Sequence, residues 1–311
     1  MQGIGTLNNN EYTILSVKHN EGDIISYLAR HNQTQNLRII VFKNDHRGLM
    51  MGNDDFPANE INVLNILNNA NNPNILGYIE NGNGILALNG KEPKNKQYLI
   101  FENASKFDLF TYIKKGGKFP ERQAKLIFRK ILNGVSAIHN ANYCHLFLTP
   151  SNILFHEQNN HYEPKIHGLN SCRLNANNLQ NYSGIIHYRA PEIEERRPFN
   201  GFKCDIFCLG QILFNLVCGI HGFSSAKKND LYYRLIMQKN FYEYWNSSEL
   251  KGLNVSQGFR ELVVRMLAYK PDERPTINDI LQNEWMREID NQIDVIEQEL
   301  SNELHQREAN I

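Results

Sequence analysis

The sequence predicts an α+β fold with a small part rich in β-strands and a larger part rich in α-helices. Residues 12–42 alternate apolar and polar side chains in short runs, which is the pattern of half-buried strands. From residue 107 onward, apolar side chains recur at steps of three and four, which is the pattern of a helix face. The chain has 311 residues, 41% of them apolar, which suffices for one large domain or two smaller ones.

Each part has its own set of expected elements. In the small part we expect one helix at residues 57–67 and strands at 12–17, 24–30, 37–42, 75–80, 85–88 and 98–102. In the larger part we expect helices at residues 107–113, 121–140, 203–218, 230–238, 257–267 and 277–286. This order predicts a polar N-terminal extension at 1–11, a small lobe at 12–102, a large lobe at 103–286 and an amphipathic helix at 287–311.

The last segment allows two interpretations. Ile289, Ile293, Ile296 and Leu300 follow one another at alternating steps of four and three residues, which makes about two heptads of a coiled-coil seam. The helix can lie on the large lobe, or it can pair with a second copy of the chain through residues 289–304. The first interpretation is preferred, because a confident coiled coil needs three or four heptads.

Bulk composition excludes several classes of partner. The 33 basic and 33 acidic residues balance, so we expect no nucleic acid and no acidic membrane surface as a partner. The five cysteines show no C-x-x-C spacing and are predicted to be free thiols, which favours a cytoplasmic location. Asparagine makes up about 14% of the chain and gathers between the periodic segments, which we interpret as a compositional feature of loops.

One stretch, residues 143–155, stands at the centre of the larger part. It reads Y-C-H-L-F-L-T-P-S-N-I-L-F, follows a long helical pattern and ends in a short apolar run suited to a strand. His145, Leu148, Pro150 and Asn152 have the spacing of H-R-D-L-K-P-x-N-I-L. In outline the stretch therefore resembles the catalytic loop of eukaryotic protein kinases.

Other motifs in the expected order strengthen this resemblance. Ala190-Pro191-Glu192, the run D-I-F-C-L-G at 205–210 and the run P-D-E-R-P-T at 271–276 resemble A-P-E, D-x-W-S-L-G and D-P-x-x-R-P-T of the family. Residues 60–64 resemble the regulatory helix, and residues 98–102 the strand before the hinge. The resemblance covers about residues 12–286 and is closest to the Ser/Thr branch around the calmodulin-dependent kinases. It implies a bilobal kinase fold, with a β-rich N-lobe that carries one regulatory helix and a larger helical C-lobe.

The resemblance also implies scaffold roles. It pairs Glu192 with Arg274, and it makes Asp205 accept backbone N–H bonds from the loop at 143–155. Three further residues fall where the family stacks an apolar spine: Leu64, His145 and Leu169.

The residues that carry the family's chemistry are missing. Leu146 stands where the family has Arg, and Phe147 stands where it has the Asp that accepts the substrate proton. Gly168-Leu169-Asn170 replaces D-F-G, whose Asp binds Mg²⁺. A shift of register rescues neither position, because residues 122–156 and 164–191 contain no Asp or Glu. Loss of a positioned general base costs about 10²–10⁴ in rate.

The nucleotide site implied by the resemblance is degraded as well. It would comprise Gly22, Lys43, Glu60, Phe101, Glu102, Asn152 and Leu154. Only Gly22 remains of the glycine-rich loop, and an ordinary hairpin turn explains it equally. The strand Lys can be Lys43, which could pair with Glu60, or the slot can hold Val41. Asn152 can be a metal ligand or a structural Asn that bonds local backbone. We therefore expect weak ATP binding and weak or absent Mg²⁺ binding.

These expectations predict a pseudokinase, which is a kinase fold with little or no phosphotransfer that works as a binding or allosteric scaffold for protein partners. The alternative is a divergent ATP-binding Ser/Thr protein kinase with residual or rewired activity. In that case His167, Asn170 or Glu157 would supply the chemistry.

Overall fold

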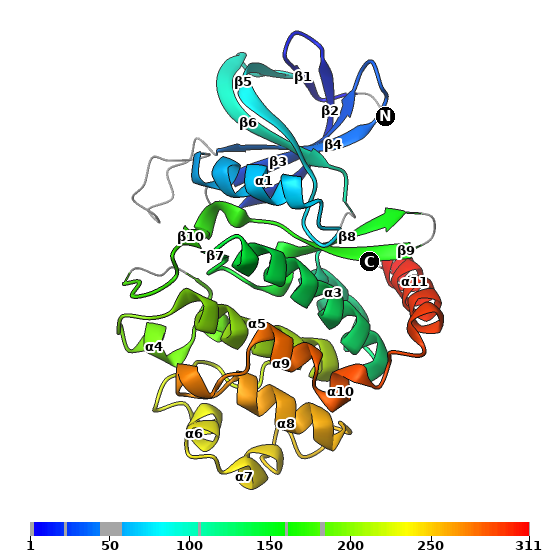
Figure 1. Cartoon of the computed structure of the whole chain (residues 1–311). Helices are drawn as coiled ribbons and strands as arrows, with labels where there is room; N and C mark the ends of the chain where they lie inside the picture. The colour runs from blue at the N-terminus through cyan, green and yellow to red at the C-terminus, as the bar shows by residue number, and fades with distance from the viewer. Residues whose placement is uncertain are drawn as a thin grey trace. The chain divides into compact units, whose positions relative to one another are not determined.

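The computed structural model describes residues 3–21, 24–43, 58–104, 107–158, 161–180 and 184–310. It has the expected α+β composition and separates into two compact units (Figure 1). Unit 1 comprises residues 1–106 and unit 2 residues 107–311. The limit between them lies four residues after the expected limit at residue 102.

Unit 1 is a closed β-barrel with one helix, α1 (Ala58–Ala70), where the sequence predicts a helix. The strands lie in the order β1-β2-β3-β4-β6-β5. Their bounds are Gly5–Leu7 for β1, Tyr12–Glu21 for β2, Ile24–His31 for β3, Leu37–Lys43 for β4, Tyr78–Leu88 for β5 and Lys94–Glu102 for β6. The two strands expected at 75–80 and 85–88 are therefore one continuous strand, β5.

The N-terminal segment is part of the barrel, which differs from the expected polar extension at 1–11. Strand β1 pairs with β2 on one side and with β5 on the other, so it closes the barrel. The side chain of Leu7 is fully buried in the barrel core. A strand of three residues shows too little alternation to be seen in the sequence, and only its pairing partners reveal it.

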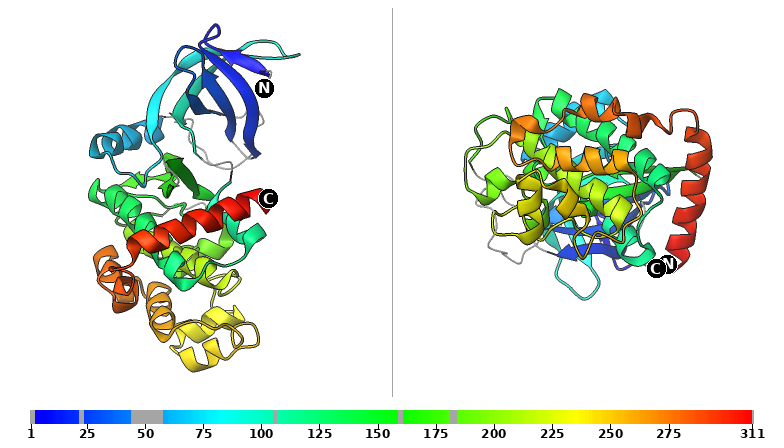
Figure 2. Two further views of the ribbon diagram at one scale, coloured as in Figure 1. Left: turned by 90° about the vertical axis from the view of Figure 1, so that its right-hand side faces the viewer. Right: turned by 90° about the horizontal axis from the view of Figure 1, so that it is seen from below.

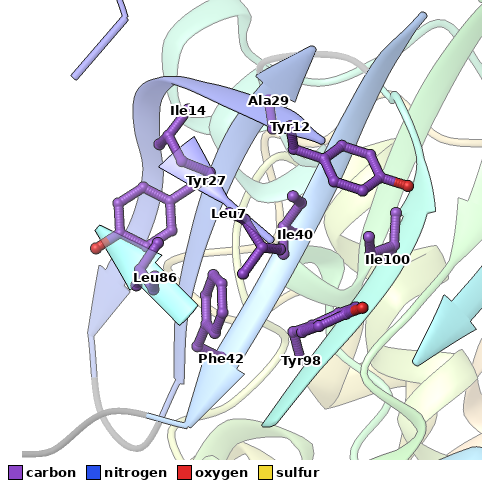
Figure 3. Close-up of a cluster of buried hydrophobic side chains, with 10 residues drawn as sticks. All are labelled: Leu7, Tyr12, Ile14, Tyr27, Ala29, Ile40, Phe42, Leu86, Tyr98 and Ile100. Carbon is purple, nitrogen blue, oxygen red and sulfur yellow. The ribbon is translucent and has the colours of Figure 1, made fainter. Parts of the chain in front are cut away.

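The core of unit 1 fills the barrel (Figure 3). Its aromatic members meet edge to face, with ring centroids 5.8 Å apart for Tyr27 and Phe42 and 6.4 Å apart for Phe42 and Tyr98. Such contacts add about 0.5–1.5 kcal/mol to the effect of burial. The residues labelled in Figure 3 come from β1 to β6: Leu7, Tyr12, Ile14, Tyr27, Ala29, Ile40, Phe42, Leu86, Tyr98 and Ile100.

Unit 2 is mainly helical. Its described helices are α2 (Leu109–Gly116), α3 (Glu121–Asn140), α4 (Pro191–Glu194), α5 (Gly201–Cys218), α6 (Leu231–Met237), α7 (Phe241–Trp245), α8 (Gln257–Met266), α9 (Ile277–Leu281), α10 (Glu284–Arg287) and α11 (Ile293–Asn310). Two small sheets join β7 (Tyr143–Cys144) to β10 (Arg173–Leu174), and β8 (Ile153–Gln158) to β9 (His161–Ile166).

Helix α5 is the central element of unit 2. Asn200 caps its start by accepting a hydrogen bond from the Lys203 N–H, and Gly219 ends it in the left-handed conformation at φ 75°. Among the described residues α5 is the one helix long and apolar enough to cross a membrane, but 89% of it is buried inside unit 2. It is therefore the core helix of a folded unit. Three of the five cysteines lie on it, and all five are free and buried.

Two helices of unit 2 differ from their predictions. The segment expected as one helix at 277–286 is broken into α9 and α10, because Asn283 accepts a hydrogen bond from the Trp285 N–H and caps a new helix start. The tail helix expected at 287–311 begins only at Ile293.

The tail helix lies on its own unit. Helix α11 packs beside α2, α3 and β9 (Figure 2). Ile296, Leu300 and Leu304 are buried there, and Ile289 is buried just before the helix, whereas Val295 on the outer side is 59% exposed. These apolar side chains of the proposed seam are therefore buried within a single chain. A homodimer through 289–304 stays a prediction.

The abundance of asparagine has a conformational explanation. In the described part of the chain, eleven non-glycine residues have a positive φ, and seven of them are asparagine: Asn8, Asn9, Asn10, Asn71, Asn142, Asn175 and Asn178. Asparagine tolerates this left-handed region better than most residues. Two of the seven also bond to each other, since Asn142 Nδ2 donates to Asn175 Oδ1 at 2.6 Å beside the β7–β10 pair.

We expect Asn142→Ala to lower the free energy of unfolding by about 1–2 kcal/mol, because alanine at φ 63° is strained and the bond to Asn175 is lost. Asn142→Gly should cost less, since glycine adopts this φ without strain. Urea unfolding of the two variants tests this, and equal destabilisation by both would show that the left-handed backbone is not the reason for asparagine.

Candidate functional site

The loop at 145–149 is held between regular elements of unit 2. Helix α3 ends at Asn140, and β7 follows at Tyr143–Cys144. After the loop, a single 3-10 turn at Pro150–Asn152 leads directly into β8. The central stretch of the sequence is therefore a short, bounded connection between two strands.

Asp205 on α5 holds the backbone of this loop in place. Its carboxylate accepts hydrogen bonds from the backbone N–H groups of His145 at 2.7 Å and Leu146 at 2.9 Å. The imidazole Nε2 of His139 lies 2.9 Å from the same carboxylate. The Asp205 side chain is fully buried and has lost its hydrating water. Hydrogen bonds from these three nitrogens take the place of that water. The role expected for Asp205 is present in the structure.

The backbone at Leu146 depends on this anchor. Leu146 has φ 61°, a left-handed conformation that costs an ordinary side chain about 1–2 kcal/mol. Its side chain is 4% exposed, so it lies in the core and cannot bind an anion as the family's arginine does. The bond from its N–H to Asp205 offsets the strain.

His145 is a neutral part of the loop framework. Its Nδ1 accepts from the Phe147 N–H at 3.2 Å, so its Nε2 carries the proton and donates to the His167 carbonyl at 3.2 Å. Burial lowers the pKa of His145 below its ordinary value, because a charged ring would lose its hydration. The residue links the loop to the segment that follows β9.

The side chain at 147 offers no proton acceptor. Phe147 is half-buried and contributes only its backbone N–H to the loop. The aromatic ring has no lone pair, and residues 122–156 contain no carboxylate that could take its place.

The side chains around Asn152 and Gly168 fit a magnesium ion poorly. Asn152 Oδ1 accepts from the Thr149 hydroxyl at 2.8 Å, which directs its amide oxygen into the loop. Its Nδ2, a donor that repels cations, lies so close to Gly168 that a Cβ there would approach it to 2.5 Å. Among the described residues no three His, Cys, Asp or Glu side chains gather as a metal site. These residues do not fit a hard cation, which prefers carboxylate oxygens.

Of the three residues proposed to replace the missing catalytic groups, His167 and Glu157 form structural contacts and Asn170 is exposed. His167 donates its backbone N–H to the Asn152 carbonyl at 3.0 Å, and its Nε2 donates to the Ser151 carbonyl at 3.1 Å. Glu157 lies on β8, where its carboxylate contacts His305 of α11 at 3.1 Å. Asn170 lies exposed on a 3-10 turn. The structure brings His167 to the loop and does not bring Glu157 there.

A second buried network ties α4 to the end of unit 2. Arg274 donates to both carboxylate oxygens of Glu192, each at 2.7 Å, and both residues are nearly inaccessible. Burial alone would raise the pKa of Glu192, but the hydrogen bonds and charge of Arg274 outweigh it and lower the pKa. The expected ion pair is present, and its two parallel bonds give it a fixed geometry.

Most of the remaining candidate residues of the nucleotide site belong to unit 1. Glu60 on α1 is 6% exposed. Val41 on β4 pairs with Ser26, and the side chain of Lys43 lies outside the described part of the structure, so the choice between them for the expected lysine slot stays open. Glu102 accepts from the Gly77 N–H at 2.7 Å, and the Phe101 ring packs on Tyr78. Gly22 lies outside the described residues.

Two contributors to the site escaped the sequence. His139 of α3 contacts Asp205, and the Thr149 hydroxyl orients Asn152. His139 belongs to no motif, and Thr149 lies at a motif position with a different side chain, so only the fold shows their roles. Leu154 follows the loop on β8, where it pairs with Lys165 and forms a bridge to Asp108.

Comparison with known proteins gives a consistent result. The family model described as protein kinase domain matches residues 26–286. The probable serine/threonine-protein kinase HSL1 of Saccharomyces cerevisiae is 31% identical over 199 residues, which are 64% of this chain and 12% of that protein. The probable serine/threonine-protein kinase KCC4 of the same yeast is 33% identical over 198 residues, 63% of this chain and 18% of that protein. The match thus spans less than a fifth of either relative.

We expect Arg274→Ala to lower the free energy of unfolding by about 3–5 kcal/mol, because it leaves the Glu192 carboxylate buried without its partner. Arg287→Ala is the matched control, since its pair with Asp290 is exposed and worth about 0–1 kcal/mol. Urea midpoints measure both variants. Similar midpoints for the two would mean that the buried pair does not stabilise unit 2.

The lowered pKa of His145 predicts a pH dependence. Below the ordinary histidine pKa of 6.5, the unfolded chain binds a proton at this residue that the folded chain excludes. Stability should therefore be retained above pH 6.5 and fall as pH decreases below it, by up to about 1.4 kcal/mol per unit from this residue. His145→Leu should flatten the dependence between pH 6.5 and 5.5. An unchanged slope in His145→Leu contradicts a neutral His145.

Proposed function

Because the chain belongs to the protein kinase domain family, we propose that it is a pseudokinase. In this proposal the two compact units are the two lobes of a kinase fold, and the protein acts as a binding or allosteric module with little or no phosphotransfer. The observation that carries the proposal is the absence of any carboxylate from residues 122–156, which contain the loop, and from residues 164–191, which contain the Gly168-Leu169-Asn170 segment.

The geometry of the loop supports the loss of proton transfer. Phosphoryl transfer depends on positioning and charge neutralisation, to which a base at position 147 would contribute about 10²–10⁴ in rate. Phe147 provides no acceptor atom, and His145 already uses both ring nitrogens in the loop framework. A hydroxyl group of a substrate would therefore find no base at this position.

The surroundings of Asn152 support weak or absent metal binding. The amide oxygen is bonded to Thr149, the amide nitrogen lies against Gly168, and no carboxylate replaces the missing aspartate. Any ATP that binds should then bind weakly and without the help of Mg²⁺, since the metal would remain uncompensated beside neutral ligands.

The intact scaffold supports a role in binding. Asp205 and the Glu192–Arg274 pair hold the loop and the segment around α4 in fixed shapes, and neither network uses a side chain at 147 or 168. A platform of this kind can recognise protein partners without turnover. Five buried free thiols fit the proposed cytoplasmic location, where thiols stay reduced.

An active enzyme is the alternative, and the relatives named as serine/threonine-protein kinases favour it. In that case His167 or Asn170 would have to replace charged groups with neutral ones. Electrostatic stabilisation carries most of such catalysis, so a neutral replacement would leave only a small part of the rate.

A phosphotransfer assay separates the two. The full chain is incubated with γ-labelled ATP, Mg²⁺ or Mn²⁺, and generic Ser/Thr substrates, beside Asn152→Ala as the matched control. We expect no transfer above background for either protein. Metal-dependent transfer that disappears in Asn152→Ala would overturn the proposal, whereas equal transfer by both proteins would indicate a contaminating kinase.

Thermal unfolding with ATP tests the cofactor. A ligand at 100 times its Kd adds about 2.7 kcal/mol of stability, which is easily seen as a rise in Tm. We expect a small rise or none, and the same value with and without Mg²⁺. A larger rise that requires Mg²⁺ would show that the loop does hold a metal.

A further inference from the structure

We propose that α11 is a strap that fastens the C-terminal end of α2 and the β8–β9 hairpin to the body of unit 2, with Arg307 as its latch. This inference goes beyond the proposed function and holds whether or not the protein transfers phosphate. It concerns residues 293–310, which lie outside the part of the chain matched by the family model.

The apolar side of the strap is continuous. Ile296, Leu300 and Leu304 recur every four residues and are at most 1% exposed, and Ser301 beside them is also buried. The helix that carries them packs beside α2, α3 and β9 (Figure 2). Packing of the helix thus removes these three apolar side chains from solvent.

Arg307 fixes the far end of the strap. Its Nη1 donates to the carbonyls of Tyr112 at 3.1 Å and Gly117 at 2.6 Å, and its Nη2 donates to the Lys118 carbonyl at 2.9 Å. The guanidinium also lies 3.9 Å from the centre of the Phe119 ring. The carbonyls at the end of a helix lack partners within the helix, so Arg307 acts as a cap for α2.

The end of α2 is shaped for this side chain. Gly116 is the last residue of α2, and a Cβ at this position would lie 2.7 Å from Arg307 Cδ. No left-handed φ explains the glycine, since Gly116 is not among the residues with positive φ. Room for Arg307 is therefore the reason for glycine here.

Two neighbours of Arg307 extend the latch to the hairpin. The Glu308 carboxylate accepts from the Tyr112 hydroxyl of α2 and, at 3.4 Å, from the Tyr162 hydroxyl of β9. His305 contacts Glu157 of β8 at 3.1 Å and packs its ring against Tyr162. One end of one helix thus joins α2, β8 and β9.

Helix α2 and strand β8, which the strap holds, are connected to the candidate loop. A bridge from Asp108 to Leu154 joins the start of α2 to β8, and β8 follows the candidate loop without a gap. Release of Arg307 would loosen α2 and the hairpin, and it would also uncover Ile296, Leu300 and Leu304. Docking of α11 therefore controls both the rigidity of the loop's surroundings and the access to this apolar seam.

The other polar contacts of α11 provide the control. Arg122 of α3 pairs with Glu299, but its side chain is 51% exposed, whereas that of Arg307 is 5% exposed. Exposed pairs contribute little to stability, so the two arginines should behave differently although both contact the same helix.

Hydrogen exchange of the full chain, read by mass spectrometry, tests the strap. Arg307→Ala should speed exchange in residues 109–118 and 296–304 by about tenfold or more, because it removes buried hydrogen bonds from a charged group. Exchange within α5 should not change. Arg122→Ala should leave all three regions as in the parent, and Arg307→Lys should fall between, since an ammonium cannot span three carbonyls.

Gly116→Ala tests the latch without changing Arg307 itself. Alanine favours a helix over glycine, so this change alone should slow exchange in α2. We expect faster exchange in the parent background, because the methyl group displaces Arg307, and slower exchange in the Arg307→Ala background, where the space is free. Slower exchange in both backgrounds, or unchanged exchange of residues 109–118 in Arg307→Ala, would overturn the proposal. If Arg307→Ala does not fold, Gly116→Ala and Arg307→Lys in the parent background carry the test.

Discussion

The hydrogen bonds between Asp205 and the backbone at 145–146 are the constraint on which the centre of unit 2 depends. A carboxylate with no solvent access is costly to bury, and here the His145 and Leu146 amides and the His139 ring satisfy it. In return it keeps Leu146 in a left-handed conformation. His145, held at its backbone in this way, links the loop to the segment after β9 through its ring.

The catalytic side chains can be absent while the scaffold is kept, because the bonds of Asp205 to the loop go to main-chain atoms and not to the side chains at 147 and 168. Asp205 binds main-chain nitrogens, so it is indifferent to the side chains at 146 and 147. The Glu192–Arg274 pair lies elsewhere in unit 2 and contacts neither Phe147 nor Gly168. A kinase fold can thus keep its central loop in shape while no carboxylate remains on it.

Glycine and asparagine at 168 and 152 illustrate the same separation. A side chain at 168 would have to share its space with the Asn152 amide, which Thr149 orients from the other side. The three residues form a neutral contact where the family holds a charged one. On helix α11 a buried charged side chain likewise has a structural role. Arg307 donates hydrogen bonds to carbonyl groups at the C-terminal end of α2.

The sequence by itself determined the α+β class, the family, helix α3 to the residue, and the two scaffold networks, because these rest on side chains that recur at fixed spacing or in motifs. It also determined that residues 122–156 and 164–191 contain no carboxylate, which no fold can alter. Tertiary structure alone decided that Gly5–Leu7 closes a barrel and that Asn142 and Asn175 support left-handed turns. It also decided that the seam of α11 lies inside its own unit and that Arg307 caps α2. These features depend on partners far away in the chain, and a local pattern carries no information about which distant surface it will meet.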